Sequence, residues 1–369
     1  MDIIYYFHRW AAVAAFVMIA AHSLILRVNY AGAIGPLDPR DAPWQMTAGR
    51  VALGLFAMLI VTSLWRKALR FEYDAWRWTH GAIAGVAMIL AITHIWGVGH
   101  YTGAAWRGGV WGLYTGLWVL VIVYIRVVRP RALQRAPYRV VDVAAERGRS
   151  WTVRARPEGH AGFHFSPGQF AWLTLRASPF QAKEHPFSIA SSADDPGTLA
   201  FTIKELGDFT RTIGSVRAGE LAYVDGPHGV FTTDLHPNAA RFTFIAGGIG
   251  IAPIMSMLRT LADRRDARPL RLVYGNRRWE DVVFREEIQA LGSRLTLTVL
   301  HVLQEPAIDW SGRRGMLDEA VIRAAVPAGE AGATYFMCGP KPMSHSVQRT
   351  LRRMGVPLRR IHCELFDMA

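Results

Sequence analysis

Cysteine is scarce in this chain, and the two cysteines that occur, Cys338 and Cys363, both lie in the C-terminal half. Two cysteines at this spacing supply neither a disulfide framework nor the ligand spacing of a zinc site. Acidic residues are also few, because 29 Asp and Glu stand against 42 Lys and Arg, which gives a formal net charge of +13. The basic residues are not interleaved with aromatic ones as in a nucleic-acid groove, so we expect no nucleic-acid partner. We expect no secretory signal peptide either, since His8 and Arg9 interrupt the first apolar run.

Long apolar segments, in contrast, fill the N-terminal third of the chain. Hydrophobic residues make up 51% of the sequence, and those before Pro130 gather into four runs. Each run is near the length needed to cross a hydrocarbon core of about 30 Å. The sequence therefore predicts an all-α membrane domain over residues 1–130, with four helices at approximately 5–26, 48–65, 79–98 and 110–125.

The distribution of basic residues predicts how these helices are oriented. The connection after the second run carries four basic residues: Arg66, Lys67, Arg70 and Arg77. The loops on the opposite side carry only three: Arg27, Arg40 and Arg107. An excess of Lys and Arg marks cytoplasmic loops, so we expect a multi-pass protein of the plasma (inner) membrane with both termini in the cytoplasm.

Four histidines in the apolar runs form two pairs, His8 with His22 and His80 with His94, each fourteen residues apart. Fourteen residues of α-helix return to within about 40° of the starting direction and rise by about 21 Å. A single histidine in an apolar helix is more often a packed core residue than a ligand, but ionisable side chains inside a membrane favour a functional role. The spacing predicts two b-type haems, the inner iron held by His8 and His80 and the outer iron by His22 and His94.

The chain changes character after Pro137. Short alternating apolar runs punctuated by Gly and Pro predict a β-barrel over residues 137–235. Strands expected at 242–246, 270–274 and 295–301 then alternate with helical stretches, which predicts an α/β doubly wound parallel sheet over residues 240–369.

A glycine-rich turn follows the first strand of that sheet and opens a helix. Its glycines admit a pyrophosphate, and the helix N-terminus attracts the negative charge. The candidate dinucleotide-binding residues of this turn are Gly247, Gly248, Gly250 and Pro253.

Arg277 and Arg278 follow the second strand of the same sheet. An arginine at this position can pair with the 2′-phosphate of NADPH, which favours NADPH over NADH. The alternative, a solvated basic loop, stays equally open.

The segment His185-Pro186-Phe187-Ser188-Ile189 resembles the flavin-binding element of ferredoxin-reductase-type flavoproteins, and the histidine in its first position is similar to the ferric reductase and NADPH oxidase branch. The resemblance implies that these residues line an FAD, with the Ser188 hydroxyl facing the reactive ring nitrogen. It also implies an FAD diphosphate site made by three later residues: Lys204, Gly207 and Thr210.

The resemblance extends to the C-terminus. Cys338-Gly339-Pro340 is similar to the family's third nicotinamide element, which implies a thiol near the hydride-transfer carbon. In the tail, the family's ending implies that Glu364 neighbours the flavin-site serine and that Phe366 covers the flavin face until nicotinamide displaces it. The expected catalytic residues are therefore Ser188, Cys338, Glu364 and Phe366.

The resemblance covers nearly the whole chain and implies electron transfer from cytosolic NADPH through FAD and two b-type haems to an acceptor outside. The acceptor stays open between dioxygen, giving superoxide, and ferric chelates, as does an additional membrane subunit. The family usually has six membrane helices, and we expect this chain to lack the first two. The alternative is a membrane-anchored reductase that passes electrons to a cytosolic partner protein, with the histidines structural.

Overall fold

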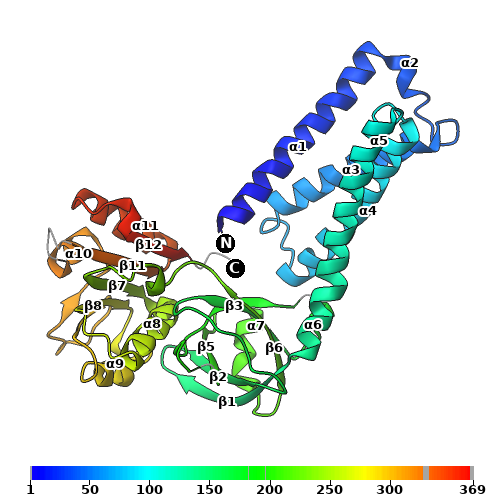
Figure 1. The fold of residues 1–369 in the computed structure, drawn as a ribbon. Coiled ribbons are helices and arrows are strands. Elements are labelled where there is room, and N and C mark those ends of the chain that lie inside the picture. Colours follow the sequence, from blue (N-terminus) through cyan, green and yellow to red (C-terminus); the bar gives the residue numbers. More distant parts are fainter. Residues whose placement is uncertain (1, 182, 196, 327–331, 366–369) are drawn as a thin grey trace. The chain divides into compact units, whose positions relative to one another are not determined.

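The fold is taken from a computed structural model, which describes residues 2–181, 183–195, 197–326 and 332–365. It divides into two compact units, Met1–Pro130 and Arg131–Ala369 (Figure 1). The first unit is helical, and the second contains two β-sheets. This order of elements confirms the predicted fold class.

The helical unit contains the predicted membrane spans. Within the described residues, 4 helices are long and apolar enough to cross a membrane. The helices are α1 (Asp2–Asn29), α2 (Ala31–Ile34), α3 (Trp44–Leu64), α4 (Tyr73–Val98) and α5 (Ala105–Val123), which a π-helical turn, η1 (Tyr124–Val128), joins to α6 (Arg129–Arg135).

All four long helices differ in extent from the predicted spans, α4 and α5 the most. Helix α4 begins at Tyr73, six residues before the expected start, because the Ala75 amide donates to the Glu72 carboxylate at 3.0 Å and the helix continues past its apolar part. Arg77 therefore lies inside α4 rather than in the preceding connection. Helix α5 also continues, through η1, into α6. Hydropathy marks the apolar part of a helix and not its polar ends, which explains both differences.

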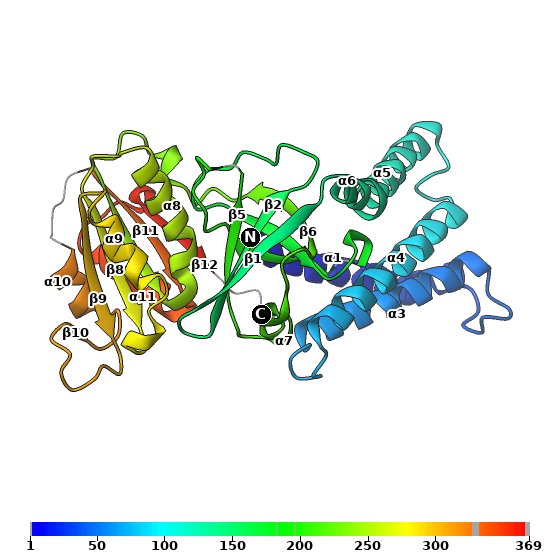
Figure 2. The same ribbon diagram turned by 90° about the horizontal axis from the view of Figure 1, so that it is seen from below.

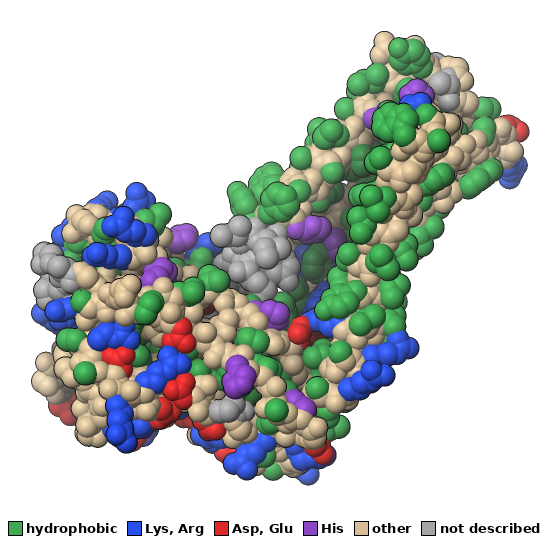
Figure 3. Space-filling view, in the orientation of Figure 1, with side chains coloured by type: hydrophobic (Ala, Val, Ile, Leu, Met, Phe, Trp, Pro, Cys, Tyr) green, Lys and Arg blue, Asp and Glu red, His purple; other side chains and the backbone are tan. Residues whose placement is uncertain are grey.

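Helices α3 and α4 pack closely through small side chains. Ala48 and Ala52 of α3 and Ala87 of α4 are buried, and small residues at a contact let helix backbones approach each other in a membrane. Large hydrophobic side chains are exposed elsewhere on the long helices, such as Met18 of α1 and Leu120 of α5. Hydrophobic side chains cover much of the helical unit (Figure 3), as expected of surfaces that face lipid.

Arg50 is a charged residue inside the α3 span that the charge count of the loops did not include. Its guanidinium donates to the carbonyls of Ile34 and Pro36, both at 2.8 Å. These contacts satisfy a charge that would otherwise be costly in a membrane, and they fix the connection between α1 and α3.

The first sheet is a curled antiparallel barrel in the order β4-β3-β6-β1-β2-β5 (Figure 2). A bridge between Ile189, just after β4, and Phe201 of β5 closes it. Its interior is filled by apolar residues such as Leu173 and Phe201. We call this part the barrel lobe; its strands are β1 (Tyr138–Glu146), β2 (Ser150–Pro157), β3 (Phe170–Leu175), β4 (His185–Ser188), β5 (Leu199–Lys204) and β6 (Leu221–His228), with the short helices η2 (Pro179–Gln181), α7 (Asp208–Arg211), η3 (Ile213–Ser215) and η4 (Thr233–Leu235).

The second sheet is parallel, in the order β10-β9-β8-β7-β11-β12. We call it, with its helices, the nucleotide lobe. Its strands are β7 (Arg241–Gly247), β8 (Leu270–Asn276), β9 (Leu297–Leu303), β10 (Arg313–Arg314), β11 (Ala333–Gly339) and β12 (Ile361–Leu365). Its helices are η5 (Gly248–Gly250), α8 (Ile251–Asp263), η6 (Trp279–Asp281), α9 (Arg285–Leu291), α10 (Glu319–Ala325), α11 (Lys341–Arg353) and η7 (Leu358–Arg360).

Helices cover both faces of this parallel sheet (Figure 1). Along β7, Phe244 belongs to a core shared with α8 and α9, whereas its neighbour Ile245 belongs to a core shared with α10 and α11. Successive side chains of a strand point to opposite faces, so an uninterrupted apolar strand is what a sheet covered on both faces requires.

Candidate functional site

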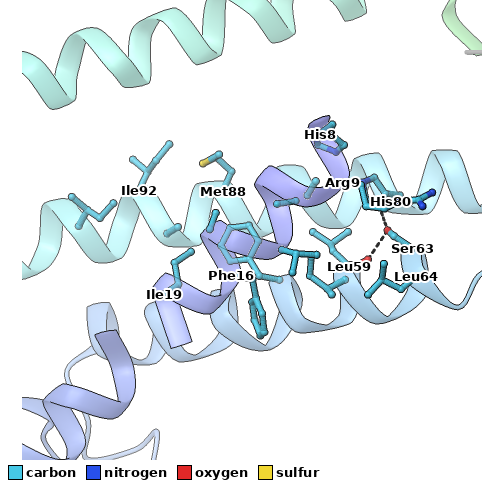
Figure 4. Close-up of a pocket in the computed structure, with 18 of the residues that line it drawn as sticks. His8, Arg9, Phe16, Ile19, Leu59, Ser63, Leu64, His80, Met88 and Ile92 are labelled. Carbon is cyan, nitrogen blue, oxygen red and sulfur yellow. Dashed lines mark hydrogen bonds between the residues drawn. The ribbon is translucent and has the colours of Figure 1, made fainter. Parts of the chain in front are cut away.

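A cavity of about 710 Å³ lies in the helical unit between α1, α3, α4 and α5, and both His8 and His80 line it (Figure 4). Small and aromatic side chains make up much of its wall, including Ala12, Ala15, Ala84, Phe16, Trp111 and Tyr114. The volume is within the range of about 300–1,000 Å³ that is typical of small-molecule and cofactor pockets. A mostly apolar cavity with one histidine on each of two helices fits a flat macrocycle held by two imidazoles.

The contacts of His80 fix which ring nitrogen can bind a metal. The Ser63 hydroxyl donates to the Leu59 carbonyl at 2.6 Å, so its oxygen is left to accept from His80 Nδ1 at 3.3 Å (Figure 4). With the proton on Nδ1, the lone pair of Nε2 is available. Metal-binding histidines in proteins characteristically donate their second ring N–H in this way.

His94 has the same arrangement fourteen residues further along nearly the same face of α4. Its Nδ1 lies 2.9 Å from the carbonyl oxygen of Gln45, which can only accept, so Nδ1 carries the proton and Nε2 is again available. Gly49 makes this position possible, because a Cβ atom there would lie 2.6 Å from His94 Nδ1. His22 is on α1 with an exposed side chain, and its pairing with His94 stays a prediction.

The described residues contain no group of three or more His, Cys, Asp and Glu side chains that could hold a metal ion. Sequence reasoning missed three residues that contact the histidines: Ser63, Gln45 and Gly49. Nothing in the sequence links them to the histidines, because each contact depends on how α3 and α4 pack.

The predicted flavin segment forms β4, along the rim of the barrel lobe. His185 stacks on Phe209, with ring centroids 3.8 Å apart and an interplanar angle of 19°, and Phe187 lies 6.1 Å from the same ring. Ser188 and Ile189 are buried. The sequence did not single out Phe209, although it is next to Thr210, because nothing in the spacing shows that α7 packs against β4.

The predicted diphosphate residues lie where β5 ends and α7 begins. Lys204 is the last residue of β5, and Thr210 Oγ1 accepts from the Gly207 amide at 2.8 Å. The hydroxyl also accepts from the Leu206 amide at 2.8 Å. The structure thus brings Gly207 and Thr210 together in one tight turn, as the expected site requires.

The glycine turn of the nucleotide lobe lies directly against the end of β11. Gly247 ends β7, and a Cβ atom on Gly250 would lie 2.2 Å from the Cys338 carbonyl oxygen. Gly339 also lies close to the turn, since its own Cβ would lie 3.1 Å from Gly247 Cα. Strand order reverses between β7 and β11, and this switch point is where parallel α/β sheets bind nucleotides. Pro253 is buried in the first turn of α8, and Pro340 precedes α11.

Cys338 is fully buried at this switch point. Burial raises the pKa of its thiol well above the ordinary value, and the neighbouring carboxylate of Glu364 adds to the shift. Glu364 stands beside Cys338 in the register of β11 and β12. The thiol is therefore protonated at neutral pH. Phe366 lies outside the described residues.

The two arginines predicted to bind a 2′-phosphate are paired with one carboxylate. Arg277 Nε donates to Glu305 Oε1 at 2.8 Å, and Arg278 Nη2 donates to Glu305 Oε2 at 3.0 Å. The hydrogen bond from Arg277 is the main reason that the pKa of Glu305 is below its usual range. Glu305 follows β9 and was not singled out in the sequence, since 27 residues separate it from Arg278.

Helix α8 connects the glycine turn to the flavin segment. Arg259 donates to the carbonyl of Ala190, two residues after Ser188, and forms a two-pronged ion pair with Glu287 at 2.7 and 2.6 Å. One turn further, Arg264 pairs with Asp194 at 2.9 Å. The helix that follows Gly250 therefore holds the barrel lobe, which fixes the distance between the predicted flavin and nicotinamide sites.

Comparison with known families matches three parts of the chain. Residues 1–92 match the ferric reductase like transmembrane component, residues 151–230 an FAD-binding domain, and residues 244–349 an oxidoreductase NAD-binding domain. The three matches follow the order of the helical unit, the barrel lobe and the nucleotide lobe.

Among curated proteins, the C-terminal part is 32% identical over 222 residues to ferredoxin–NADP reductase B of Sorangium cellulosum, covering 58% of this chain and 89% of that protein. It is 30% identical over 211 residues to the glycine betaine monooxygenase reductase subunit of Chromohalobacter salexigens, covering 55% of this chain and 56% of that protein. The matched region thus spans little more than half the length of that second relative.

Solved structures show the same fold. The ferredoxin reductase of carbazole 1,9a-dioxygenase superposes with a TM-score of 0.54 at 26% identity, covering 63% of this chain and 69% of that chain. Flavohemoglobin from Malassezia yamatoensis superposes with a TM-score of 0.58 at 16% identity, covering 97% of this chain and 98% of that chain, a likeness of fold alone. The chain belongs to the family in which a ferric-reductase-like transmembrane domain is fused to a ferredoxin-reductase-type FAD- and NAD-binding module.

Proposed function

We propose that this protein transfers electrons from NADPH or NADH through FAD and two b-type haems to an acceptor outside the membrane, either dioxygen or a ferric chelate. Both termini face the cytoplasm of the plasma membrane in this proposal, on the basis of the loop arginines and lysines. A flavin, when bound, accepts the two electrons of a hydride and releases them one at a time, which is the form that haem iron accepts.

The observation that carries the proposal is the cavity shared by His8 and His80. The Ser63 hydroxyl holds His80 as the Nδ1-protonated tautomer, with Nε2 available for iron. The Gln45 carbonyl holds His94 in the same tautomer. Metal-binding histidines characteristically donate their second ring N–H in this way, so the two matched contacts support metal ligation at both depths of the membrane.

In the reductase module, the chain's own residues bind and position the reactants. The tight turn that Thr210 holds at Gly207 lets the FAD diphosphate approach the backbone at the start of α7, and the glycines at Gly247 and Gly250 let a dinucleotide approach the backbone closely. Arg259 keeps these two sites at a fixed separation. Buried Cys338 stays protonated and adds no charge beside the nicotinamide.

A second candidate is a membrane-anchored reductase that delivers electrons to a cytosolic partner protein. It is favoured by relatives whose names describe reductase subunits of monooxygenases. In that case the histidines would be structural.

Haem analysis of the purified full chain separates the two candidates. We expect two b-type haems per flavin in the wild type, and one in His80→Ala and in His94→Ala, with flavin content unchanged. A wild-type protein with full flavin and no haem would establish the second candidate. Superoxide detection during NADPH oxidation, with and without a ferric chelate, then identifies the acceptor.

A further inference from the structure

We propose that Glu305 determines dinucleotide preference: its carboxylate holds Arg277 and Arg278 and thereby lets the site accept NADH as well as NADPH. The inference rests on the proposed function, because it assigns the adenosine end of the dinucleotide to the carboxyl end of β8. It concerns selectivity only and does not depend on the haems or on the acceptor.

The backbone fixes the position of Glu305. The Gln304 amide donates to the Asn276 carbonyl at 3.1 Å, and the Glu305 amide donates to the Arg277 carbonyl at 2.8 Å. These bonds continue the pairing of β8 with β9 beyond the ends of both strands. Glu305 is therefore held beside the arginines by the sheet itself, and its contact with them does not depend on a flexible loop.

The three side chains lie where a bound adenosine ribose is expected. Gly247, which ends β7 at the glycine turn, is level with Gly275 of β8, so Arg277 stands two residues beyond the turn on the neighbouring strand. In nucleotide-binding sheets of this kind, acidic or basic side chains near the second strand contact the ribose 2′ position. The side chains remain open to solvent, with exposed fractions of 64% for Arg277, 58% for Arg278 and 44% for Glu305.

The hydrogen bonds show which arginine N–H groups the Glu305 carboxylate occupies and which it leaves open to a ligand. Glu305 accepts from Nε of both arginines, at 2.8 and 3.2 Å, and also from Nη2 of Arg278. The Nη groups of Arg277 and Nη1 of Arg278 have no hydrogen bond among the described residues. A 2′-phosphate can reach these donors, but it then approaches an ionised carboxylate of like charge.

NADH does not meet this repulsion. Its free ribose hydroxyl can donate to the Glu305 carboxylate, which is how acidic side chains recognise NADH in related sheets. The arginine pair attracts the phosphate and Glu305 opposes it, so the two dinucleotides are used with similar efficiency. Removal of the carboxylate charge should convert the site to one that prefers NADPH.

The test uses 2′,5′-ADP and 5′-AMP, which differ only in the 2′-phosphate, as calorimetric probes of the purified full-length protein. We expect Glu305→Gln to raise the affinity ratio of 2′,5′-ADP over 5′-AMP by about fivefold at low salt, the size of the repulsion between one carboxylate and a phosphate dianion about 8 Å apart at the dielectric of water. The increase should shrink as salt is added. The NADPH-over-NADH ratio of kcat/KM for flavin reduction should rise with it.

Glu319→Gln is the matched control. Glu319 also bridges two arginines, Arg323 at 2.8 Å and Arg353 at 2.7 Å, but it lies on α10 and pairs with arginines of α10 and α11. Its variant should leave the ratio unchanged. An unchanged or lower ratio in Glu305→Gln would overturn the role of Glu305, whereas absence of binding of either probe to the wild type would overturn the dinucleotide site as well.

Discussion

Replacement of Gly250 by alanine tests whether the glycine turn depends on its close approach to β11. Gly250 has φ −59° and ψ −7°, a conformation that alanine adopts without strain. Any effect must therefore come from crowding. The added Cβ would lie 2.2 Å from the Cys338 carbonyl oxygen and 2.8 Å from the Gly339 amide nitrogen, and both are backbone atoms that cannot rotate away.

The size of the effect follows from these distances. Ordinary contact begins at 3.4 Å, so the start of α8 and the end of β11 must separate by 3.4 − 2.2 = 1.2 Å. Overpacking of this kind typically costs about 1–3 kcal/mol, and a displacement of about 1 Å in a positioned reactant can slow a reaction by about 10²-fold. We expect the free energy of unfolding to fall by about 1–3 kcal/mol and flavin reduction by NADPH to slow by about ten- to a hundredfold.

Gly248→Ala separates crowding from backbone strain. Gly248 has φ +54° but no atom within 4 Å of its added Cβ, so alanine there costs roughly 1–2 kcal/mol of conformational strain without forcing the strands apart. Thermal unfolding followed by flavin fluorescence measures the stability of both variants, and stopped-flow absorbance measures flavin reduction. If Gly250→Ala were as stable and as fast as the wild type, the packing of the turn against Cys338 would be refuted.

Three further changes test the contacts of the histidines. Ser63→Ala removes the acceptor of His80 Nδ1 and should weaken haem retention by about tenfold, which haem titration of the apoprotein measures; Ser63→Thr should restore it. Gly49→Ala places a Cβ 2.6 Å from His94 Nδ1 and should reduce haem content to about half without changing flavin content; full haem content would contradict the placement of His94. Burial lowers the pKa of His236 below 6.5, so the unfolded state binds more protons than the folded state at that pH. The stability of the full chain should therefore fall as the pH drops from 7 to 5. If the stability of His236→Gln fell equally steeply, other groups would be responsible for the pH dependence.

Local pattern was sufficient to predict most of the fold and part of the site. Hydropathy located the four spans, and the strand–glycine–helix pattern located the turn at Gly247 and Gly250, because each signal lies within a few turns or one strand of sequence. Gly207 and Thr210 were expected together from the family resemblance, and the structure joins these residues, three apart in sequence, in one turn. In these cases the residues that form the element or the site are close together in the sequence.

The remaining contacts depend on how distant segments pack. Ser63 meets His80 only because α3 lies against α4, and Glu305 meets Arg277 only through the pairing of β8 with β9. Periodicity shows which face of a helix or strand is buried, but not which residue of another element lies opposite. The sequence predicted Arg277 as a phosphate ligand, with a solvated basic loop equally open, and could not show that Glu305 lies beside it.

Anaerobic stopped-flow mixing of the purified full-length protein with NADPH tests the central claim most directly. Flavin and haem absorbance are recorded in the same trace. The account predicts two b-type haems that become reduced after the flavin, and only one reducible haem in His80→Ala. A flavin that is reduced at the full rate in a protein that contains no haem, or whose haem stays ferric, would contradict transmembrane electron transfer through His8 and His80.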